Sequence, residues 1–196
     1  MQVDDPKVDA PRAVVVFHWI DGRAIHSKPL SKHYAELGRL TARLHEFSRA
    51  LRIERMSALE EREGCRLPIH ADLHIGNGFA RPDGMAIIDF DDMRLAHPLS
   101  DAGVTIGAAR GPLRNAYIEG YREIATFSAE WERLLPVYGL TRWLTIVGWA
   151  AARAGQIAIL RKHLPYYVAR MTLYSRALVH DDAEAYAAAF EVPPPK

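Results

Sequence analysis

The feature that most constrains this chain is a short predicted hairpin with polar residues at both of its open ends. The Arg-Pro-Asp-Gly sequence at 81–84 is a strong turn signal, because proline presets one dihedral angle and aspartate bonds its own backbone. The residues on either side, 78–80 and 85–88, therefore predict two antiparallel strands. Asn77 precedes the first strand and Asp89 follows the second, so the hairpin should bring the two together in space.

A polar loop directly before the hairpin supplies a second set of chemical groups. It reads His-Ala-Asp-Leu-His-Ile-Gly-Asn over 70–77, and Ile-Asp-Phe-Asp follows the hairpin over 88–91. Phosphoryl transfer needs a carboxylate that orients or deprotonates the attacking hydroxyl and oxygen ligands that hold Mg²⁺ against the phosphates. Asn77 offers a neutral oxygen and Asp89 a charged one, which suits Mg²⁺. The kinase catalytic loop has the same H-x-D-L-x-x-x-N pattern, followed by Asp-Phe.

On these residues the chain resembles the aminoglycoside phosphotransferase and choline kinase superfamily, whose loop typically reads HGDLHxxN with a downstream IDF/W-D/E. Residues 69–74, 88–92 and 98–101 look most like the bacterial stress-response kinase A type. The resemblance spans roughly residues 13–180. It implies ATP and Mg²⁺ as cofactors and a hydroxyl of a small molecule or protein as the phosphoryl acceptor. One departure is Ala71, where the family usually has glycine, which concerns the geometry of the loop.

The resemblance also implies a role for each matching side chain. Asp72 is the expected catalytic base, and Asn77 and Asp89 are the expected Mg²⁺ ligands. Four further residues are candidates for a supporting role around the site: His70, His74, Asp91 and Asp101.

A second matching region lies near the start of the chain. The β-branched and aromatic run at 13–19 predicts a strand, and Asp21-Gly22 ends it as a turn. This segment looks like the family's hinge, so the resemblance implies nucleotide contacts by Phe17, His18 and Ile20. The family places a nucleotide-clamping lobe before the hinge, whereas only twelve residues precede Ala13 here. We therefore expect that lobe to be missing, and a lost segment or a partner chain to supply it.

Two other functions stay open at this point. The first is a catalytically impaired, truncated kinase lobe or binding module that keeps the fold without holding ATP. The second is a metal-dependent hydrolase, because the H-x-D-x-H arrangement at 70–74 offers ligands of the hydrolase type.

The rest of the sequence predicts an α+β chain that is mainly α. An apolar residue recurs every three or four positions from Tyr34 to Leu51, and further helices are expected over 116–124, 131–149 and 168–178. We expect the C-terminal lobe of a protein-kinase-like phosphotransferase with a hinge strand and a catalytic β-hairpin. The expected divisions are a polar segment at 1–12, the hinge strand and turn at 13–22, the kinase-like lobe at 23–190 and a disordered tail at 191–196.

Composition limits the partners. The net charge is +1, which suggests neither a nucleic-acid partner nor a membrane surface. The single Cys65 cannot form an internal disulfide, and no secretory signal is visible, so a cytoplasmic location is expected. The most apolar helical stretch, 144–152, is far shorter than the roughly 20 residues of a membrane span.

Overall fold

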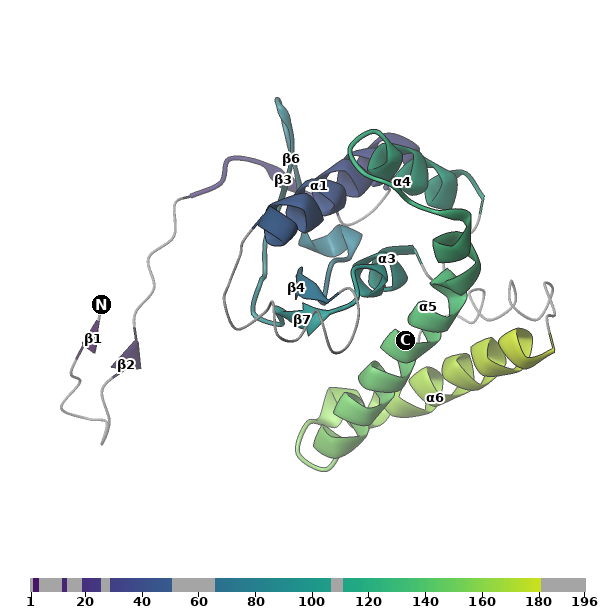
Figure 1. The fold of residues 1–196 in the computed structure, drawn as a ribbon. Helices are drawn as coiled ribbons and strands as arrows, with labels where there is room; N and C mark the ends of the chain where they lie inside the picture. Colours follow the sequence, from purple (N-terminus) through teal and green to yellow (C-terminus); the bar gives the residue numbers. More distant parts are fainter. Residues whose placement is uncertain are drawn as a thin grey trace.

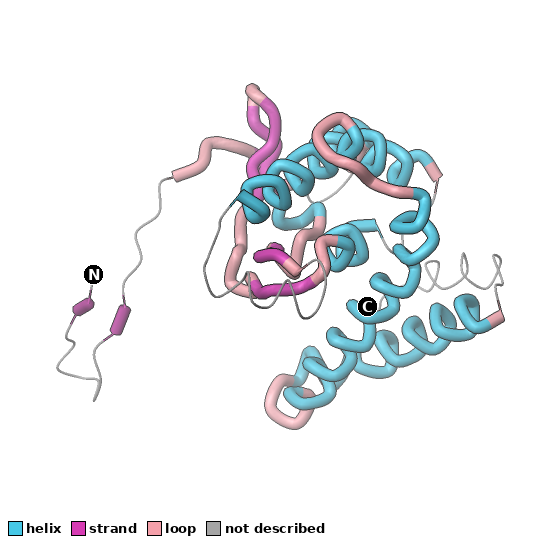
Figure 2. Tube along the Cα trace, in the orientation of Figure 1, coloured by secondary structure: helices cyan, strands magenta, loops and turns pink. Residues whose placement is uncertain are grey.

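The computed structural model describes residues 2–3, 12–13, 19–25, 29–50, 66–106 and 111–180. Helices dominate these residues, and three small antiparallel sheets lie among them (Figures 1 and 2). The prediction of a mainly helical α+β chain is therefore confirmed. Within the described parts, no helix is long and apolar enough to cross a membrane.

The region expected to form the hinge is described only in part. Arg12–Ala13 is a short strand, β2, which pairs with β1 at Gln2–Val3. Phe17 and His18 lie outside the described residues. Trp19 and Ile20 have no regular secondary structure, and Trp19 is 89% exposed, so the prediction that the strand runs to Trp19 is wrong at that end. The tail at 191–196 also lies outside the described residues.

The predicted hairpin is confirmed. β5 (Gly78–Arg81) and β6 (Gly84–Ile87) pair antiparallel from Gly78–Ile87 to Arg81–Gly84, which leaves a two-residue turn at 82–83. The Arg81 guanidinium donates to both oxygens of Asp83 at 2.9 and 3.1 Å and closes the turn. β3 (Arg23–Ala24) adds to the other edge of β5, so the sheet order is β3-β5-β6.

A second sheet carries the loop that precedes the hairpin. β4 (Leu67–Ile69) pairs antiparallel with β7 (Arg94–Ala96), and a short 3₁₀ helix, Ile75–Asn77, joins the loop to β5. β7 was not predicted from the sequence, because a strand of three residues is too short to show an alternating pattern of apolar and polar residues.

Two helices pack closely against each other at the side of the molecule that holds the main core. α1 (Ser31–Ala50) crosses α4 (Pro112–Arg122) at two glycines, and a Cβ added to Gly38 or Gly120 would lie 2.1 Å from Tyr117 O or 2.0 Å from Ala35 O. The face of α1 that is buried is partly polar and small: Tyr34, Leu37, Gly38, Thr41, Ala42, His45 and Ser48. The predicted apolar face is therefore wrong at its C-terminal end, where Phe47 is 62% exposed. Close helix approach selects small side chains here, and this outweighs the apolar period.

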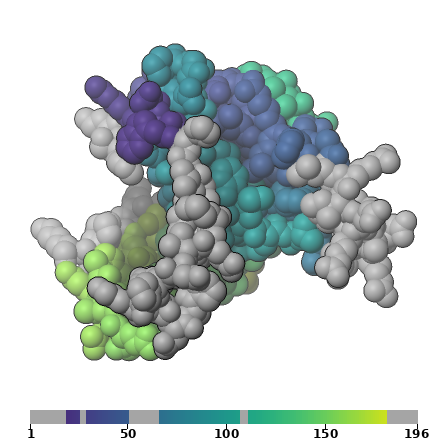
Figure 3. All heavy atoms as spheres, turned by 90° about the vertical axis from the view of Figure 1, so that its left-hand side faces the viewer, coloured from purple at the N-terminus to yellow at the C-terminus, as the bar shows by residue number. Residues whose placement is uncertain are grey.

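Two long helices follow and form an arm beside the rest (Figure 1). α3 (Leu99–Ile106) packs against α5 (Ala129–Arg153), and α6 (Ala158–Val179) packs along α5. Pro136 lies inside α5, and its carbonyl accepts a hydrogen bond from the Tyr174 hydroxyl at 2.9 Å. In the view of Figure 3, the yellow-green atoms of α6 gather at the lower edge, away from the blue atoms of α1.

Candidate active site

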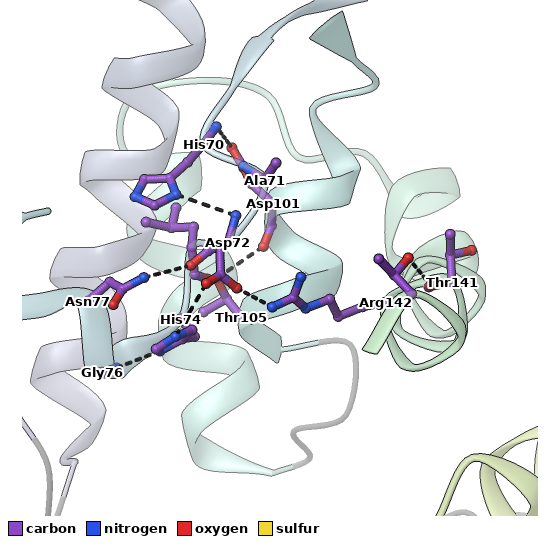
Figure 4. Close-up of polar contacts among 12 residues, drawn as sticks. His70, Ala71, Asp72, His74, Gly76, Asn77, Asp101, Thr105, Thr141 and Arg142 are labelled. Carbon is purple, nitrogen blue, oxygen red and sulfur yellow. Dashed lines mark hydrogen bonds and ion pairs between the residues drawn. The ribbon is translucent and has the colours of Figure 1, made fainter. Parts of the chain in front are cut away.

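The candidate site is built on the loop between β4 and the 3₁₀ helix (Figure 4). Asp72 stands on this loop with a side chain that is 19% exposed. The Asn77 amide nitrogen donates to the Asp72 backbone oxygen at 3.0 Å, which fixes the Asn77 side chain across the loop. Because the nitrogen of that amide is used, its oxygen is the atom left to accept or to ligate.

The two ends of the hairpin meet beside this loop. The backbone N–H of Ile88 donates to the Asn77 carbonyl at 3.0 Å. Asp89 is the next residue after Ile88, so its backbone lies close to Asn77. This confirms that the hairpin brings these two positions together. Asp89 has a φ of 68°, a left-handed conformation that aspartate tolerates better than most residues but that costs about 1 kcal/mol.

His70 links the loop to the hairpin. Its Nδ1 accepts a long hydrogen bond from the Asp72 N–H at 3.4 Å, so Nε2 carries the proton that is donated to the Ile88 carbonyl at 2.9 Å. The ring is fully buried and packs 4.5 Å from the ring of Phe90. Both ring nitrogens are therefore engaged in holding the loop.

A buried carboxylate sets the shape of the loop. Asp101, in the first turn of α3, accepts from the backbone N–H groups of His70 at 3.1 Å and Ala71 at 2.7 Å. Ala71 has a φ of 68°, which accounts for the family's usual glycine at this position. Asp101 thus holds two consecutive N–H groups in a conformation that alanine alone disfavours.

A histidine and a tyrosine support this carboxylate from behind. His45 Nε2 lies 3.1 Å from Asp101 Oδ2, and His45 Nδ1 lies 2.9 Å from the Tyr121 hydroxyl. Burial raises the pKa of Tyr121 to about 12, so its hydroxyl stays protonated and donates to His45. The chain of contacts from α4 through α1 to α3 ends on the loop that carries Asp72.

The structure adds a residue that the sequence interpretation missed. Arg142, on α5, forms an ion pair with Asp72 Oδ1, as Figure 4 shows. His74 Nε2 lies 3.7 Å from the other carboxylate oxygen, while His74 Nδ1 accepts from the Gly76 N–H at 3.0 Å. Arg142 follows Asp72 by 70 residues, and no local pattern marks it among the other helix arginines.

A cavity of about 370 Å³ opens next to Asp72. It lies between the loop side and α5 and is lined by Asp72, Asp92, Arg94, Arg142, Thr145, Ile146 and Trp149. Of the acidic residues after the hairpin, the structure places Asp92 in this lining, while the candidate Asp91 is an exposed turn residue. Ile20, the described candidate for nucleotide contact, is half-buried and does not line this cavity.

The donor set beside the loop fits Mg²⁺. Among the described residues, no group of three or more His, Cys, Asp or Glu side chains is arranged to hold a metal ion. Mg²⁺ needs no such cage, because it is usually bound by one or two carboxylates, phosphate oxygens and water. The amide oxygen of Asn77 and the carboxylate of Asp89, which leave the same end of the hairpin, are of that kind.

Comparison with known proteins points to the same class. Residues 53–137 match the family described as "Phosphotransferase enzyme family". Among solved structures, the microcompartment-associated aminopropanol kinase is 22% identical with a TM-score of 0.71, and the match covers 92% of this chain and 72% of that one. An amicoumacin kinase in complex with AMP-PNP, Ca²⁺ and Ami is 15% identical with a TM-score of 0.62, and the match covers 78% of this chain. This chain spans 62% of the amicoumacin kinase. No curated protein matches.

These comparisons confirm the resemblance to the aminoglycoside phosphotransferase superfamily and the kinase-like fold. The chain thus resembles kinase-type phosphotransferases in its fold and, over residues 53–137, in its sequence.

Proposed function

We propose that this chain transfers the γ-phosphoryl group of ATP to a hydroxyl of a small molecule or protein, in a reaction that depends on Mg²⁺. The observation that carries the proposal is a pair of hydrogen bonds that ties Asn77 to the Asp72 loop and to Ile88, the residue before Asp89. One runs from the Asn77 amide to the Asp72 carbonyl, and the other from the Ile88 N–H to the Asn77 carbonyl. A base and two oxygen ligands thus sit on one braced loop and hairpin, which is the arrangement that phosphoryl transfer needs.

Each side chain then has a role in the reaction. The acceptor oxygen forms a bond to the γ-phosphorus while the bond from that phosphorus to the β,γ-bridging oxygen breaks and ADP leaves. Asp72 takes the hydroxyl proton, and Asp101 keeps the Asp72 loop in shape through its bonds to the N–H groups of His70 and Ala71. Asn77 and Asp89 would hold Mg²⁺, which neutralises phosphate charge when bound. Phe17, His18 and Ile20 remain the proposed nucleotide contacts.

The hydrogen bonds of His70 count against the hydrolase alternative. A zinc ligand needs a free ring nitrogen, whereas His70 Nε2 is bonded to the Ile88 carbonyl and its Nδ1 faces the Asp72 N–H. In the H-x-D-x-H pattern at 70–74, His70 is therefore used to hold the loop.

The test is phosphoryl transfer from Mg-ATP by the purified full chain, followed as ADP release with a panel of neutral, cationic and anionic hydroxyl compounds. We expect Asp72→Asn to lower kcat by about 10²- to 10⁴-fold, because the proton acceptor is removed while the side-chain volume is kept. Asp83→Asn is the matched control, since Asp83 lies in the hairpin turn at the far end from the site and pairs with Arg81. Activity that survives Asp72→Asn would contradict the proposed role.

Two other results would favour the alternatives. If the full chain shows neither a rise in melting temperature with Mg-ATP nor any turnover, the chain is an impaired kinase lobe or a binding module. If metal analysis finds stoichiometric zinc, the hydrolase is favoured.

A further inference from the structure

The cavity beside Asp72 has a charge pattern that selects among hydroxyl compounds. Two arginines and two aspartates line it: Arg94 and Arg142, and Asp72 and Asp92. If Asp72 is reserved for the acceptor hydroxyl, as the proposed function requires, the rest of the lining has one net positive charge. A cationic acceptor would gain only Asp92 and would face both guanidinium groups.

Both arginines have N–H groups without a hydrogen-bond partner among the described residues. In Arg142, only one terminal nitrogen is bonded, to Asp72, and no other partner of this side chain is found among the described residues. Arg94 lies on the edge strand β7 and forms no hydrogen bond or ion pair with any side chain that the structure describes. A guanidinium carries five N–H groups in a planar fork that matches a carboxylate or a phosphate, so the cavity presents unused anion donors.

The ion pair between Arg142 and Asp72 links acceptor binding to the base. While Arg142 holds Asp72 Oδ1, only the second carboxylate oxygen, Oδ2, is left to accept a proton from a hydroxyl. An anionic group in the cavity competes with Asp72 for the Arg142 guanidinium and so releases the carboxylate. Neither a neutral nor a cationic acceptor offers Arg142 a replacement charge.

From these contacts, and resting on the proposed function, we infer that the acceptor is a hydroxyl compound that carries an anionic group, a carboxylate or a phosphate. Arg142 and Arg94 hold the anionic group in the cavity, and the hydroxyl is left to Asp72. The apolar walls of Ile146 and the half-exposed Trp149 cover the carbon skeleton. The volume of about 370 Å³ admits a compound of the size of one sugar ring.

The experiment is calorimetric titration of the full chain, without nucleotide, with four matched hexoses. Glucose is the neutral probe, glucosamine is the cationic probe, and glucuronate and glucose phosphate are the two anionic probes. We expect at least one anionic probe to bind about tenfold more tightly than glucose, and glucosamine to bind no better than glucose. The affinities of glucuronate and glucose phosphate then show whether the site prefers a carboxylate or a phosphate.

Single substitutions test whether the anionic probe binds in this cavity. Arg142→Ala and Arg94→Ala should each weaken the anionic probe by about tenfold, while Arg133→Ala, an exposed arginine on α5 outside the cavity lining, should leave it unchanged. Asp72→Asn should tighten the anionic probe a few-fold, because Arg142 is then no longer shared with a carboxylate. Arg94 is exposed, so Arg94→Ala tests the site even if Arg142→Ala does not fold.

Three outcomes would overturn the inference. They are glucosamine binding more tightly than both anionic probes, no binding by either anionic probe, and anion binding that neither arginine variant weakens. None of them depends on turnover, so this inference can fail while Asp72-dependent phosphoryl transfer stands. Conversely, loss of the proposed function would leave the anion titration unaffected.

Discussion

The loop that carries Asp72 and the helix that carries Arg142 meet in one ion pair, but they are held in different ways. Buried polar contacts hold the loop: Asp101, His45 and His70 are all fully buried and hydrogen-bonded. The arm formed by α5 and α6 has few buried residues, which are Leu135, Gly139 and Ala150 in α5 and Leu160, Tyr174 and Ala177 in α6. Leu144 and Ile159 on this arm are 52% and 64% exposed.

This difference separates the loop that carries the proposed catalytic base from the helix that lines the proposed acceptor cavity. A loop fixed by many buried bonds tolerates little change, because each lost partner leaves a buried polar group without a bond. A helix with few buried contacts accepts substitutions at small cost. The residues proposed for phosphoryl transfer thus lie on the constrained side, and the residues proposed to face the acceptor lie largely on the tolerant side.

The sharpest test of this contrast is the removal of the Asp101 carboxylate. We expect Asp101→Ala to lower the free energy of unfolding by about 3 to 5 kcal/mol, because two backbone N–H groups and His45 lose a buried acceptor. Urea unfolding measures the change, with Asp83→Ala at the exposed turn as a control expected within about 0.5 kcal/mol. A loss for Asp101→Ala below about 1 kcal/mol would mean that the loop is held by other contacts.

A pair of glycine substitutions compares helix packing on the two sides. Gly120→Ala should cost about 1 to 3 kcal/mol, because the added Cβ would lie 2.0 Å from the Ala35 carbonyl of α1. Gly148→Ala on α5 should instead gain about 0.5 to 1 kcal/mol from helix propensity, since nothing lies within 4 Å of the added Cβ. Thermal unfolding of both variants gives opposite signs if the contrast is right. Equal losses would show that α5 is packed as tightly as α4.

A smaller effect is expected at the strained loop residue. Ala71→Gly should raise the free energy of unfolding by up to about 1 kcal/mol, because glycine adopts a φ of 68° without the Cβ clash. Ala80→Gly in β5 is the control, and it should lose about 1 kcal/mol, because glycine weakens the interior of a strand. Chemical denaturation of both variants measures the difference, and a loss in both would show that the Asp101 bonds leave no strain at Ala71.

The smallest effect concerns acid stability where α3 meets α5. Burial, then the nearby His45 and Arg49, lowers the pKa of His97, whose Nδ1 accepts from the Leu99 N–H at 3.1 Å. The neutral ring is therefore favoured in the folded state, so this stability is fully present above the unfolded pKa of about 6.5 and is lost as the pH falls. We expect His97→Asn to flatten the loss of stability between about pH 7 and pH 5 by less than about 1 kcal/mol. An unchanged slope in the denaturation series would exclude His97 as the titrating group.

The parts of the site that could be predicted are those that local chemistry determines. The turn at 82–83 follows from proline and aspartate alone, and it is enough to place Asn77 beside Asp89. The loop at 70–77 stands next to that hairpin in the chain, so its position follows as well.

The parts that could not be predicted depend on contacts between distant segments. Arg142 reaches Asp72 only because α5 passes the loop, and its sequence neighbours on α5 give no sign of this. The buried His45 was missed because apolar periodicity favours Leu44 and Phe47, whereas the close packing of α1 and α4 buries the neighbouring face. Both misses arise from tertiary packing that outweighs a local pattern.

The position of Asp101 in the chain also bears on the order in which the protein acquires its structure. The loop N–H groups that it binds lie 30 and 31 residues earlier. During synthesis, residues 70 and 71 leave the ribosome before their acceptor exists, so the loop stays without its native conformation until α3 has been made. The reactive geometry is therefore a late event in folding, and it depends on a non-local closure rather than on the hairpin, which can form early by itself.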